Sequence, residues 1–255
     1  MTQGEKARAF AALHIPGSPV ILFNAWDPGS AKSVAEAGAK AIATGSWSVA
    51  AANGFSDAEA LPFDLALANA ERIVKAVDLP VTLDFEGGYA VEPPELAANF
   101  ALVLSTGAIG CNFEDQVVGG EGLHPVKVQA ARIEALRREA ERAGIPAFIN
   151  ARTDIFLKAG PEAHDAAAVD QALERAHAYA DAGASGFFVP GLADERLLAR
   201  VCESSPLPVN AMMFPGMPST KRLAELGLAR ISHGPGPYRH AMKALTEAAR
   251  AALIA

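Results

Sequence analysis

Two acidic residues follow an apolar segment about one third of the way along the chain, and two glycines come directly after them. The stretch reads Val81-Thr82-Leu83-Asp84-Phe85-Glu86-Gly87-Gly88. Every second side chain of an extended segment points to the same side, so Asp84 and Glu86 share one side. Glu114 follows a second apolar segment. Carboxylate oxygens are ligands that Mg²⁺ and Mn²⁺ prefer, so Asp84, Glu86 and Glu114 are predicted to hold one of these metals.

Arg152 is a fixed positive charge that follows another apolar segment, Ala147–Asn150. Its planar guanidinium can hold a substrate carboxylate through two parallel hydrogen bonds, which a lysine cannot do. The alternative is an ion pair with Asp154 or Glu114, and the two uses can coexist. Gly45 and Ser46 could add backbone N–H groups and a hydroxyl to such a carboxylate site.

Two histidines are candidates for proton transfer because imidazole titrates near neutral pH. His124 ends a glycine-rich loop, 119–124, of the kind that forms active-site lids. His233 follows the last apolar segment, where an acid–base role and a packing or capping role stay equally open. The full set of candidate substrate-binding residues is Trp26, Gly45, Ser46, Trp47, Asp84, Arg152 and Asn210.

Eight short apolar segments alternate with amphipathic ones along the whole chain. The predicted strands are Val20–Phe23, Ala39–Ala43, Val81–Asp84, Ile109–Phe113, Ala147–Asn150, Gly186–Val189, Pro208–Ala211 and Ala229–Ser232. The clearest helical patterns are Pro62–Val77, Pro93–Ser105, Pro125–Ala143, Ala166–Ala182 and Thr220–Leu226, and Pro237–Ala255 would be the eighth helix. Eight such units predict a (β/α)8 barrel over residues 1–255, with its site at the C-terminal strand ends. A doubly wound open sheet is less favoured, because no G-x-G-x-x-G follows the first strand.

Size and charge narrow the class of protein. The chain has 255 residues, about half of them apolar, and a net charge of −7. That charge argues against nucleic acid and anionic membranes as partners. Two cysteines cannot form a disulfide framework. The N-terminal residues show no signal-peptide pattern and no segment reaches membrane-spanning length, so a cytoplasmic protein is expected.

Taken together, the motifs resemble the isocitrate lyase/phosphoenolpyruvate mutase superfamily over essentially the whole chain. The matching segments are Trp26-Asp27, Gly45-Ser46-Trp47, Asn53–Asp57, Leu83–Tyr89, Phe113-Glu114-Asp115 and Asn150–Asp154. The resemblance implies a Mg²⁺-dependent barrel, usually a tetramer, whose eighth helix is often exchanged between neighbouring subunits. It implies that Asp84, Glu86 and Glu114 surround the metal, with Asp57 further out. It also implies that Gly45, Ser46 and Arg152 hold the carboxylate of a 2-oxo or 2-hydroxy acid.

Two departures from the superfamily pattern limit what the resemblance implies about the reaction. Isocitrate and methylisocitrate lyases carry a K-[KR]-C-G-H loop, whereas residues 117–124 here contain neither cysteine nor lysine. The phosphonate mutase pattern has a histidine where Pro190-Gly191 stands. The expected function is therefore a Mg²⁺- or Mn²⁺-dependent enzyme that cleaves a C–C bond of a small 2-oxo or 2-hydroxy acid through an enolate.

Two other functions stay open at this point. One is a hydrolase or mutase that acts on the C–P bond of phosphonopyruvate-like substrates. The other is a barrel that binds a 2-oxo acid with little turnover. In each case the expected partners are a small carboxylate ligand and further copies of the chain, as a dimer or tetramer. Candidate catalytic residues are Arg152, Asp57, His124 and His233.

Overall fold

Eight parallel strands form the centre of the protein, as the sequence predicts. The structure is a computed structural model and describes residues 1–254; Ala255, the last residue of the predicted eighth helix, lies outside this range. The strands are β1 (Val20–Leu22), β2 (Ile42–Ala43), β3 (Val81–Asp84), β4 (Gly110–Glu114), β5 (Phe148–Arg152), β6 (Gly186–Phe188), β7 (Val209–Met212) and β8 (Arg230–Ser232). Their order, β1-β8-β7-β6-β5-β4-β3-β2, is that of an eight-stranded barrel.

The barrel closes between β1 and β2 just beyond the ends of the regular strands. The Ala25 N–H donates to the Ala43 carbonyl at 2.8 Å, and Ala25 and Thr44 form an isolated parallel bridge. The buried side chain of Asn24 supports this closure. Its Nδ2 donates to the Thr44 carbonyl at 2.8 Å, and its Oδ1 accepts from the Gly234 N–H at 2.8 Å. One amide thus ties together the ends of β1, β2 and β8.

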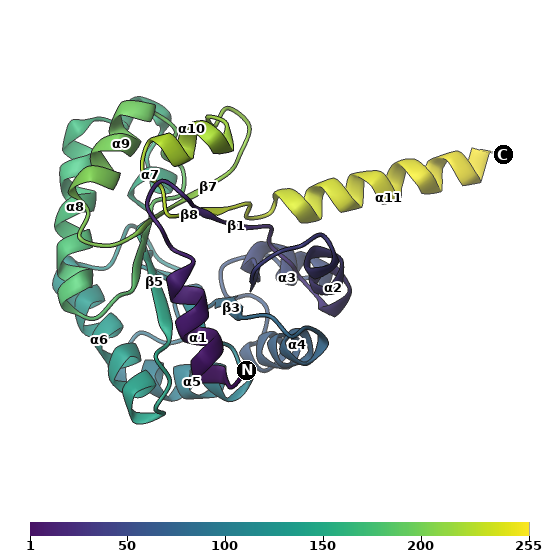
Figure 1. Cartoon of the computed structure of the whole chain (residues 1–255), viewed down its shortest axis with the longest axis horizontal. Coiled ribbons are helices and arrows are strands. Elements are labelled where there is room, and N and C mark those ends of the chain that lie inside the picture. The colour runs from purple at the N-terminus through teal and green to yellow at the C-terminus, as the bar shows by residue number, and fades with distance from the viewer. Residues whose placement is uncertain (255) are drawn as a thin grey trace.

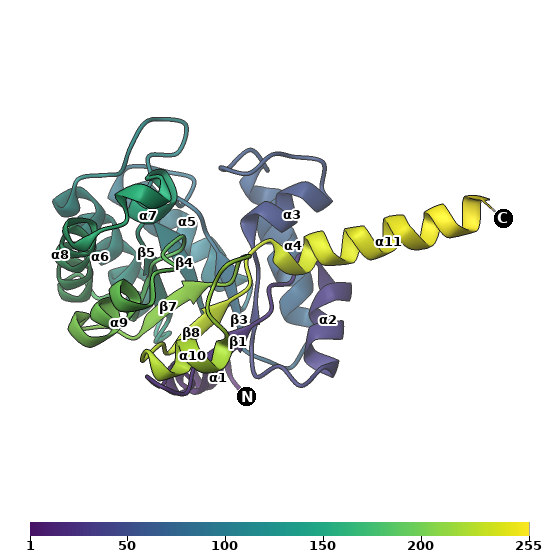
Figure 2. The same cartoon turned by 90° about the horizontal axis from the view of Figure 1, so that it is seen from above.

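Helices surround the strands, as Figures 1 and 2 show. They are α1 (Gln3–Ala12), α2 (Pro28–Glu36), α3 (Ser46–Ala52), α4 (Phe63–Ala76), α5 (Pro93–Ser105), α6 (Val126–Arg142), α7 (Ile155–Lys158), the 3₁₀ turn η1 (Pro161–Ala163), α8 (Ala166–Asp181), α9 (Glu195–Ser204), α10 (Thr220–Glu225) and α11 (Gly236–Ile254). Gly38, Gly144, Gly183 and Gly227 come shortly after the ends of α2, α6, α8 and α10, and all have the positive φ with which glycine commonly ends a helix. Within residues 1–254, no helix is long and apolar enough to cross a membrane.

The N-terminal helix α1 was not recognised in the sequence, and it packs across the start of several strands. Phe10 is fully buried and forms one cluster with Val20, Leu22 and Phe148. His14 lies just beyond the helix, where its ring stacks on Phe148 with 4.0 Å between centroids. Its Nδ1 lies 2.9 Å from the Phe10 carbonyl oxygen. These contacts place a histidine in the apolar floor of the barrel.

Burial lowers the pKa of His14 to about 3, and the charge of Arg230 acts in the same direction. Between this value and the ordinary histidine pKa, the unfolded chain binds a proton at His14 and the folded chain does not. Stability therefore falls as the pH falls below about 6.5. From pH 7 to pH 5, the free energy of unfolding of the wild-type protein should fall by roughly 2 kcal/mol more than that of His14→Gln. Urea unfolding at both pH values measures this, and equal losses in the two proteins would contradict it. His177→Gln, at an exposed position on α8, is the matched control.

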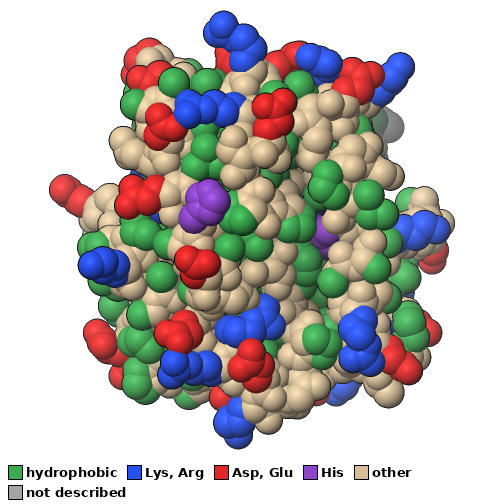
Figure 3. All heavy atoms as spheres, turned by 60° about the vertical axis from the view of Figure 1, so that its left-hand side comes forward, with side chains coloured by type: hydrophobic (Ala, Val, Ile, Leu, Met, Phe, Trp, Pro, Cys, Tyr) green, Lys and Arg blue, Asp and Glu red, His purple; other side chains and the backbone are tan. Residues whose placement is uncertain are grey.

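The last helix, α11, leaves the barrel instead of covering it, as both ribbon views show. Pro237 is its buried residue, and Leu253 and Ile254 near its end are 86% and 79% exposed. Charged side chains of both signs are mixed over the face of the molecule in Figure 3, without a broad region of one sign. Most of the buried apolar side chains form one large cluster inside and around the barrel.

Candidate active site

The predicted acids and Arg152 meet at one rim of the barrel because their strands end there. Asp84, Glu114 and Arg152 are the last residues of β3, β4 and β5. The register pairs Asp84 with Asn112 and Glu114 with Arg152 across neighbouring strands. In a barrel of this kind, active sites lie at the C-terminal ends of the strands. The rim formed by these residues is therefore the candidate active site.

Arg152 forms both of the ion pairs that the sequence left open. Its Nε and Nη2 donate to the two carboxylate oxygens of Asp154 at 2.6 and 2.9 Å, and its Nη1 lies 2.8 Å from Glu114 Oε2. Burial alone would lower the pKa of Arg152, but the charges of Glu114 and Asp154 raise it well above its ordinary value. A guanidinium has five N–H donors, so two of them stay available for a ligand. Asp154 thus fixes the orientation of Arg152 without using all of its donors.

Glu86 lies in the tight turn after β3, in the left-handed backbone region with φ of 51°. Its Oε2 accepts from the Glu59 N–H at 2.8 Å, and its Oε1 accepts from the Tyr89 hydroxyl at 3.3 Å. Burial raises the pKa of Glu86 to about 8, and the negative charge of Asp84 adds to the shift. Burial likewise raises the pKa of Glu114, against the opposing charge of Arg152. The site therefore concentrates more acidic groups than it can easily keep ionised.

Asp84 has one carboxylate oxygen that lacks a partner. Its Oδ2 accepts from the Ser46 N–H at 3.0 Å, whereas Oδ1 is buried and makes no hydrogen bond. An unpaired buried carboxylate oxygen is costly, and a cation would satisfy it. Within residues 1–254, no three His, Cys, Asp or Glu side chains are grouped so that they could hold a metal ion by themselves. The residues fit a Mg²⁺ that keeps several waters beside one or two carboxylates, and the three-acid ligand set stays a prediction.

The loop between α3 and α4 brings two further acids to the rim. Loss of surrounding water raises the pKa of Asp57, and the nearby charge of Asp84 raises it further. Glu59 was not recognised in the sequence, yet its Oε1 accepts from the Tyr89 N–H at 2.8 Å. Among the described residues, the non-glycine positions with positive φ are Ala58, Glu59, Glu86 and Tyr89. Backbone strain is thus confined to the two loops that meet at the acids, as is common at functional sites.

His124 lies beside the rim, at the end of the loop predicted to be a lid. An antiparallel bridge between Gln116 and Leu123 closes this loop at its base. The histidine is buried and lines a cavity of about 220 Å³ together with Glu59 and Arg132. Burial lowers its pKa, with Arg132 and Arg175 acting in the same direction. The lowered pKa favours the uncharged ring of His124, whose unprotonated nitrogen can accept a proton.

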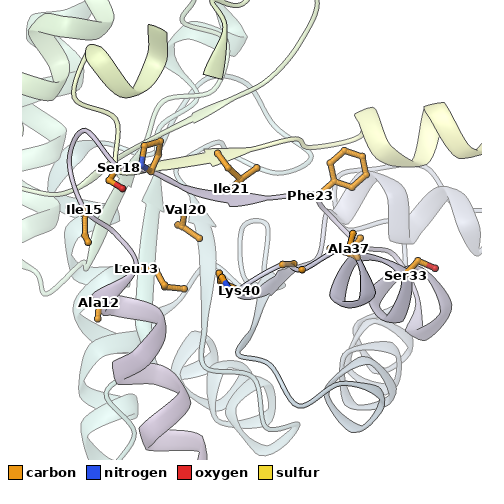
Figure 4. A pocket seen from close by; sticks show the side chains of 14 residues that line it. Ala12, Leu13, Ile15, Ser18, Val20, Ile21, Phe23, Ser33, Ala37 and Lys40 are labelled. Atoms are coloured by element: carbon orange, nitrogen blue, oxygen red, sulfur yellow. The ribbon is translucent and has the colours of Figure 1, made fainter. Parts of the chain in front are cut away.

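The other candidate residues are not all brought to the acids. The ring of His233 packs against Phe23 with 5.0 Å between centroids. Phe23 in turn lines the apolar groove shown in Figure 4. Asn210 is buried in the barrel interior, where its Oδ1 accepts from Ser232 at 3.3 Å. Trp26 and Trp47 both contact Tyr238, near the start of α11. Gly45 precedes α3 as its N-cap and places Ser46 beside Asp84.

Three residues near the acids, Glu59, Tyr89 and Gln116, were not predicted as site residues from the sequence. Glu59 and Tyr89 are 30 positions apart, and no local pattern links them. Gln116 donates to the Glu114 carboxylate from two positions along the same chain segment. Its signal was present in the sequence as a polar residue directly after the second acidic strand end. Tyr89 belongs to the segment Leu83–Tyr89 that resembles the superfamily, and the structure shows its hydroxyl donating to Glu86.

Comparison with known proteins agrees with this geometry. A model of the phosphoenolpyruvate phosphomutase family matches residues 10–253. A solved structure from Burkholderia cenocepacia J2315, proposed as a phosphonomutase, has a TM-score of 0.96 and 52% identity, and covers 98% of this chain and 99% of that chain. An uncharacterized protein of Mycobacterium tuberculosis (strain H37Rv) is 35% identical over 243 residues, which are 95% of this chain and 88% of the relative. The oxaloacetate decarboxylase of Pseudomonas fluorescens (strain SBW25) is 28% identical over 196 residues, 71% of this chain and 62% of the enzyme. The chain therefore belongs to the phosphoenolpyruvate phosphomutase family, within the superfamily that its motifs resemble.

Proposed function

We propose that this protein is a Mg²⁺-dependent carbon–carbon lyase that acts on a small 2-oxo acid of the oxaloacetate type. The observation that supports the proposal is that an acidic group and a basic group, each with free hydrogen-bonding or metal-binding capacity, lie at the same rim. Asp84 offers a buried carboxylate oxygen without a partner, and Arg152 offers two N–H donors that its ion pairs leave available. A 2-oxo acid needs both, since its oxygens bind a cation and its carboxylate binds a guanidinium.

The residues of the chain have separate tasks in such a reaction. Arg152, held by Asp154, binds the carboxylate next to the 2-oxo group and fixes its plane. Ser46, at the start of α3, orients two of the acids: its N–H donates to Asp84, and its side chain hydrogen-bonds Asp57. Asp84, with Glu86 and Glu114 around it, holds the cation. When bound, Mg²⁺ supplies Lewis-acid stabilisation of the negative charge that develops on the 2-oxo oxygen.

Asp57 is the acid that we assign to proton delivery after the bond breaks. Loss of CO₂ from oxaloacetate leaves an electron pair shared between C3 and the 2-oxo oxygen, and a proton must reach C3 to give pyruvate. The raised pKa of Asp57 keeps its protonated form populated to higher pH than an ordinary aspartate would. Its carboxyl lies close enough to Asp84 and Arg152 for both charges to affect it.

The direct test is pyruvate formation from oxaloacetate by the purified protein. The rate must be measured in three reactions: protein with Mg²⁺, protein with EDTA, and Mg²⁺ without protein. The last control is needed because the metal also decarboxylates oxaloacetate in solution. We expect metal-dependent turnover well above the protein-free rate, and poor turnover of isocitrate and methylisocitrate, since residues 117–124 lack the lyase cysteine. Efficient cleavage of isocitrate would overturn the substrate assignment. Tight binding without turnover of any 2-oxo acid would support the ligand-binding alternative.

A C–P bond enzyme is the second candidate, and one observation favours it. The Burkholderia structure that is 52% identical to this chain is proposed as a phosphonomutase. Phosphonopyruvate has the same 2-oxo carboxylate end as oxaloacetate, so Arg152 and Asp84 would bind it in the same way. Incubation with phosphonopyruvate and Mg²⁺, followed by assay of inorganic phosphate and of phosphoenolpyruvate, separates hydrolase from mutase activity. Faster turnover of phosphonopyruvate than of oxaloacetate would favour this candidate.

We further propose that the chain forms a homo-oligomer in which α11 packs on a second copy. The outer side of β1 is uncovered and forms part of an apolar groove of about 660 Å³, lined also by α1 and α2. Figure 4 shows Leu13, Ile21 and Phe23 along this groove. The exposed leucines of α11, Leu245 and Leu253, supply an apolar surface that would cover this groove on a second copy. Exposed apolar surfaces of this kind mark interfaces.

Charge on α11 should therefore disrupt the assembly. We expect Leu253→Glu to shift the protein toward the monomer, because a carboxylate cannot enter an apolar groove without a partner. Light scattering coupled to size-exclusion chromatography measures the mass. Leu157→Glu, at an exposed leucine of α7, is a matched control and should leave the mass unchanged. A monomeric wild-type protein would contradict the assembly proposal.

A further inference from the structure

The two tryptophans of the chain lie together where α11 joins the barrel. The sequence contains Trp26 and Trp47 and no other tryptophan. The ring of Tyr238, in the first turn of α11, stands edge-on to both, with centroid distances of 5.1 Å to Trp26 and 5.9 Å to Trp47. The Arg239 guanidinium lies 4.6 Å from the centroid of the Trp47 ring. These contacts join α11 to the loop that follows β1 and to the first turn of α3.

Each tryptophan is connected to the acid site through one neighbouring residue, Ser46 or Asn69. Trp47 directly follows Ser46, whose N–H donates to Asp84 Oδ2 at 3.0 Å. The Trp26 carbonyl accepts from Asn69 Nδ2 at 2.8 Å. Asn69 lines a small internal cavity together with Asp84 and Glu86. A movement of either ring would therefore reach a group that contacts or surrounds Asp84.

The position of Tyr238 is fixed on the barrel side. The Gly234 N–H donates to Asn24 Oδ1 at 2.8 Å, and the side chain of Pro237 is buried. Beyond this first turn, α11 leaves the barrel, so Leu253 lies about 22 Å along the helix from Tyr238. Within residues 1–254, the Tyr238 hydroxyl makes no hydrogen bond to another side chain or to the backbone. The contact with the tryptophans is thus made by the ring and not by the hydroxyl.

We propose that Tyr238 is a positioning residue for the candidate active site, and this inference rests on the proposed function. Its ring holds Trp26 and Trp47, and through them it holds the start of α3, so that the Ser46 N–H meets Asp84. Edge-to-face aromatic pairs favour one mutual orientation, unlike the contact of two aliphatic chains. The first turn of α11 therefore affects ligand affinity at the rim, although Tyr238 itself does not contact the carboxylates.

Tryptophan fluorescence tests the inference without any ligand, because both fluorophores belong to this cluster. The variants are Tyr238→Leu, Tyr238→Phe as the matched control that keeps the ring, and His240→Ala as a control on the exposed side of the same helix. We expect Tyr238→Leu to shift the emission maximum to longer wavelength and to increase quenching by acrylamide. Tyr238→Phe and His240→Ala should match the wild-type protein.

The second measurement is a calorimetric titration of each variant with oxalate in the presence of Mg²⁺. We expect Tyr238→Leu to weaken oxalate binding by about three- to tenfold, the range for one or two aromatic pairs, with recovery in Tyr238→Phe. The KM for oxaloacetate should rise in Tyr238→Leu with little change in kcat. A lower melting temperature with unchanged fluorescence and oxalate affinity would overturn the inference, as would equal losses in the Leu and Phe variants. Failure of the wild-type protein to bind oxalate would overturn the proposed function, and the ligand-free fluorescence would still decide whether Tyr238 holds the tryptophans.

Discussion

Replacement of Asp84 by asparagine should strongly reduce Mg²⁺-dependent turnover while the barrel stays folded. The amide has nearly the same shape as the carboxylate, so its oxygen can still accept from the Ser46 N–H. It lacks the negative charge that a hard divalent cation requires. We expect the rate on oxaloacetate to fall by about 10²–10³-fold, the range for loss of one group that stabilises transition-state charge. Initial rates over a range of Mg²⁺ concentrations measure this effect.

Asp165→Asn is the matched control for this change. Asp165 caps α8, where its Oδ1 accepts from the Ala168 N–H at 2.9 Å, and asparagine caps helices equally well. The control should keep wild-type activity and a wild-type melting temperature. Unchanged Mg²⁺ affinity in Asp84→Asn would remove Asp84 from the metal site. A large loss of helicity in that variant would show that Asp84 serves the fold instead.

Replacement of Arg152 by lysine should weaken binding of oxalate by about 1–3 kcal/mol. Lysine keeps the positive charge between Glu114 and Asp154, but it has no planar fork. It can satisfy only part of the three contacts that Arg152 makes, and it presents a carboxylate with one donor instead of two. Calorimetric titration with oxalate and Mg²⁺ gives the loss directly. Equal affinities in the two proteins would remove Arg152 from the substrate site.

Two further variants separate binding from stability at this position. Arg152→Met leaves Glu114 and Asp154 buried without their positively charged partner, so we expect it to lose about 3–5 kcal/mol of unfolding free energy. Arg142→Lys changes an exposed arginine that pairs with Glu139, and we expect it to change stability and oxalate affinity little. If Arg152→Met is as stable as the wild-type protein, the ion pairs around Arg152 do not contribute to the fold.

Local sequence patterns determined the order of the elements and the place of the site. Short apolar segments specify strands, and glycines such as Gly144 and Gly183 end helices because they alone adopt the left-handed conformation at little cost. Strand ends that carry Asp84, Glu114 and Arg152 must meet at one rim once the strands are parallel. The Arg152–Asp154 pair lies two positions apart, so it was also visible in the sequence as an alternative.

Only the tertiary structure decided which polar groups near the rim contact one another. Glu59 reaches Tyr89 from 30 positions away, and the ring of His233 turns to Phe23 rather than to the acids. The direction of α11 was equally undetermined, because an amphipathic helix packs as well on another copy as on its own barrel. Each of these outcomes depends on contacts between segments far apart in the chain, which local propensity does not encode. The sequence by itself thus determined the barrel and the residue types at its rim, while long-range packing decided their partners, orientations and burial.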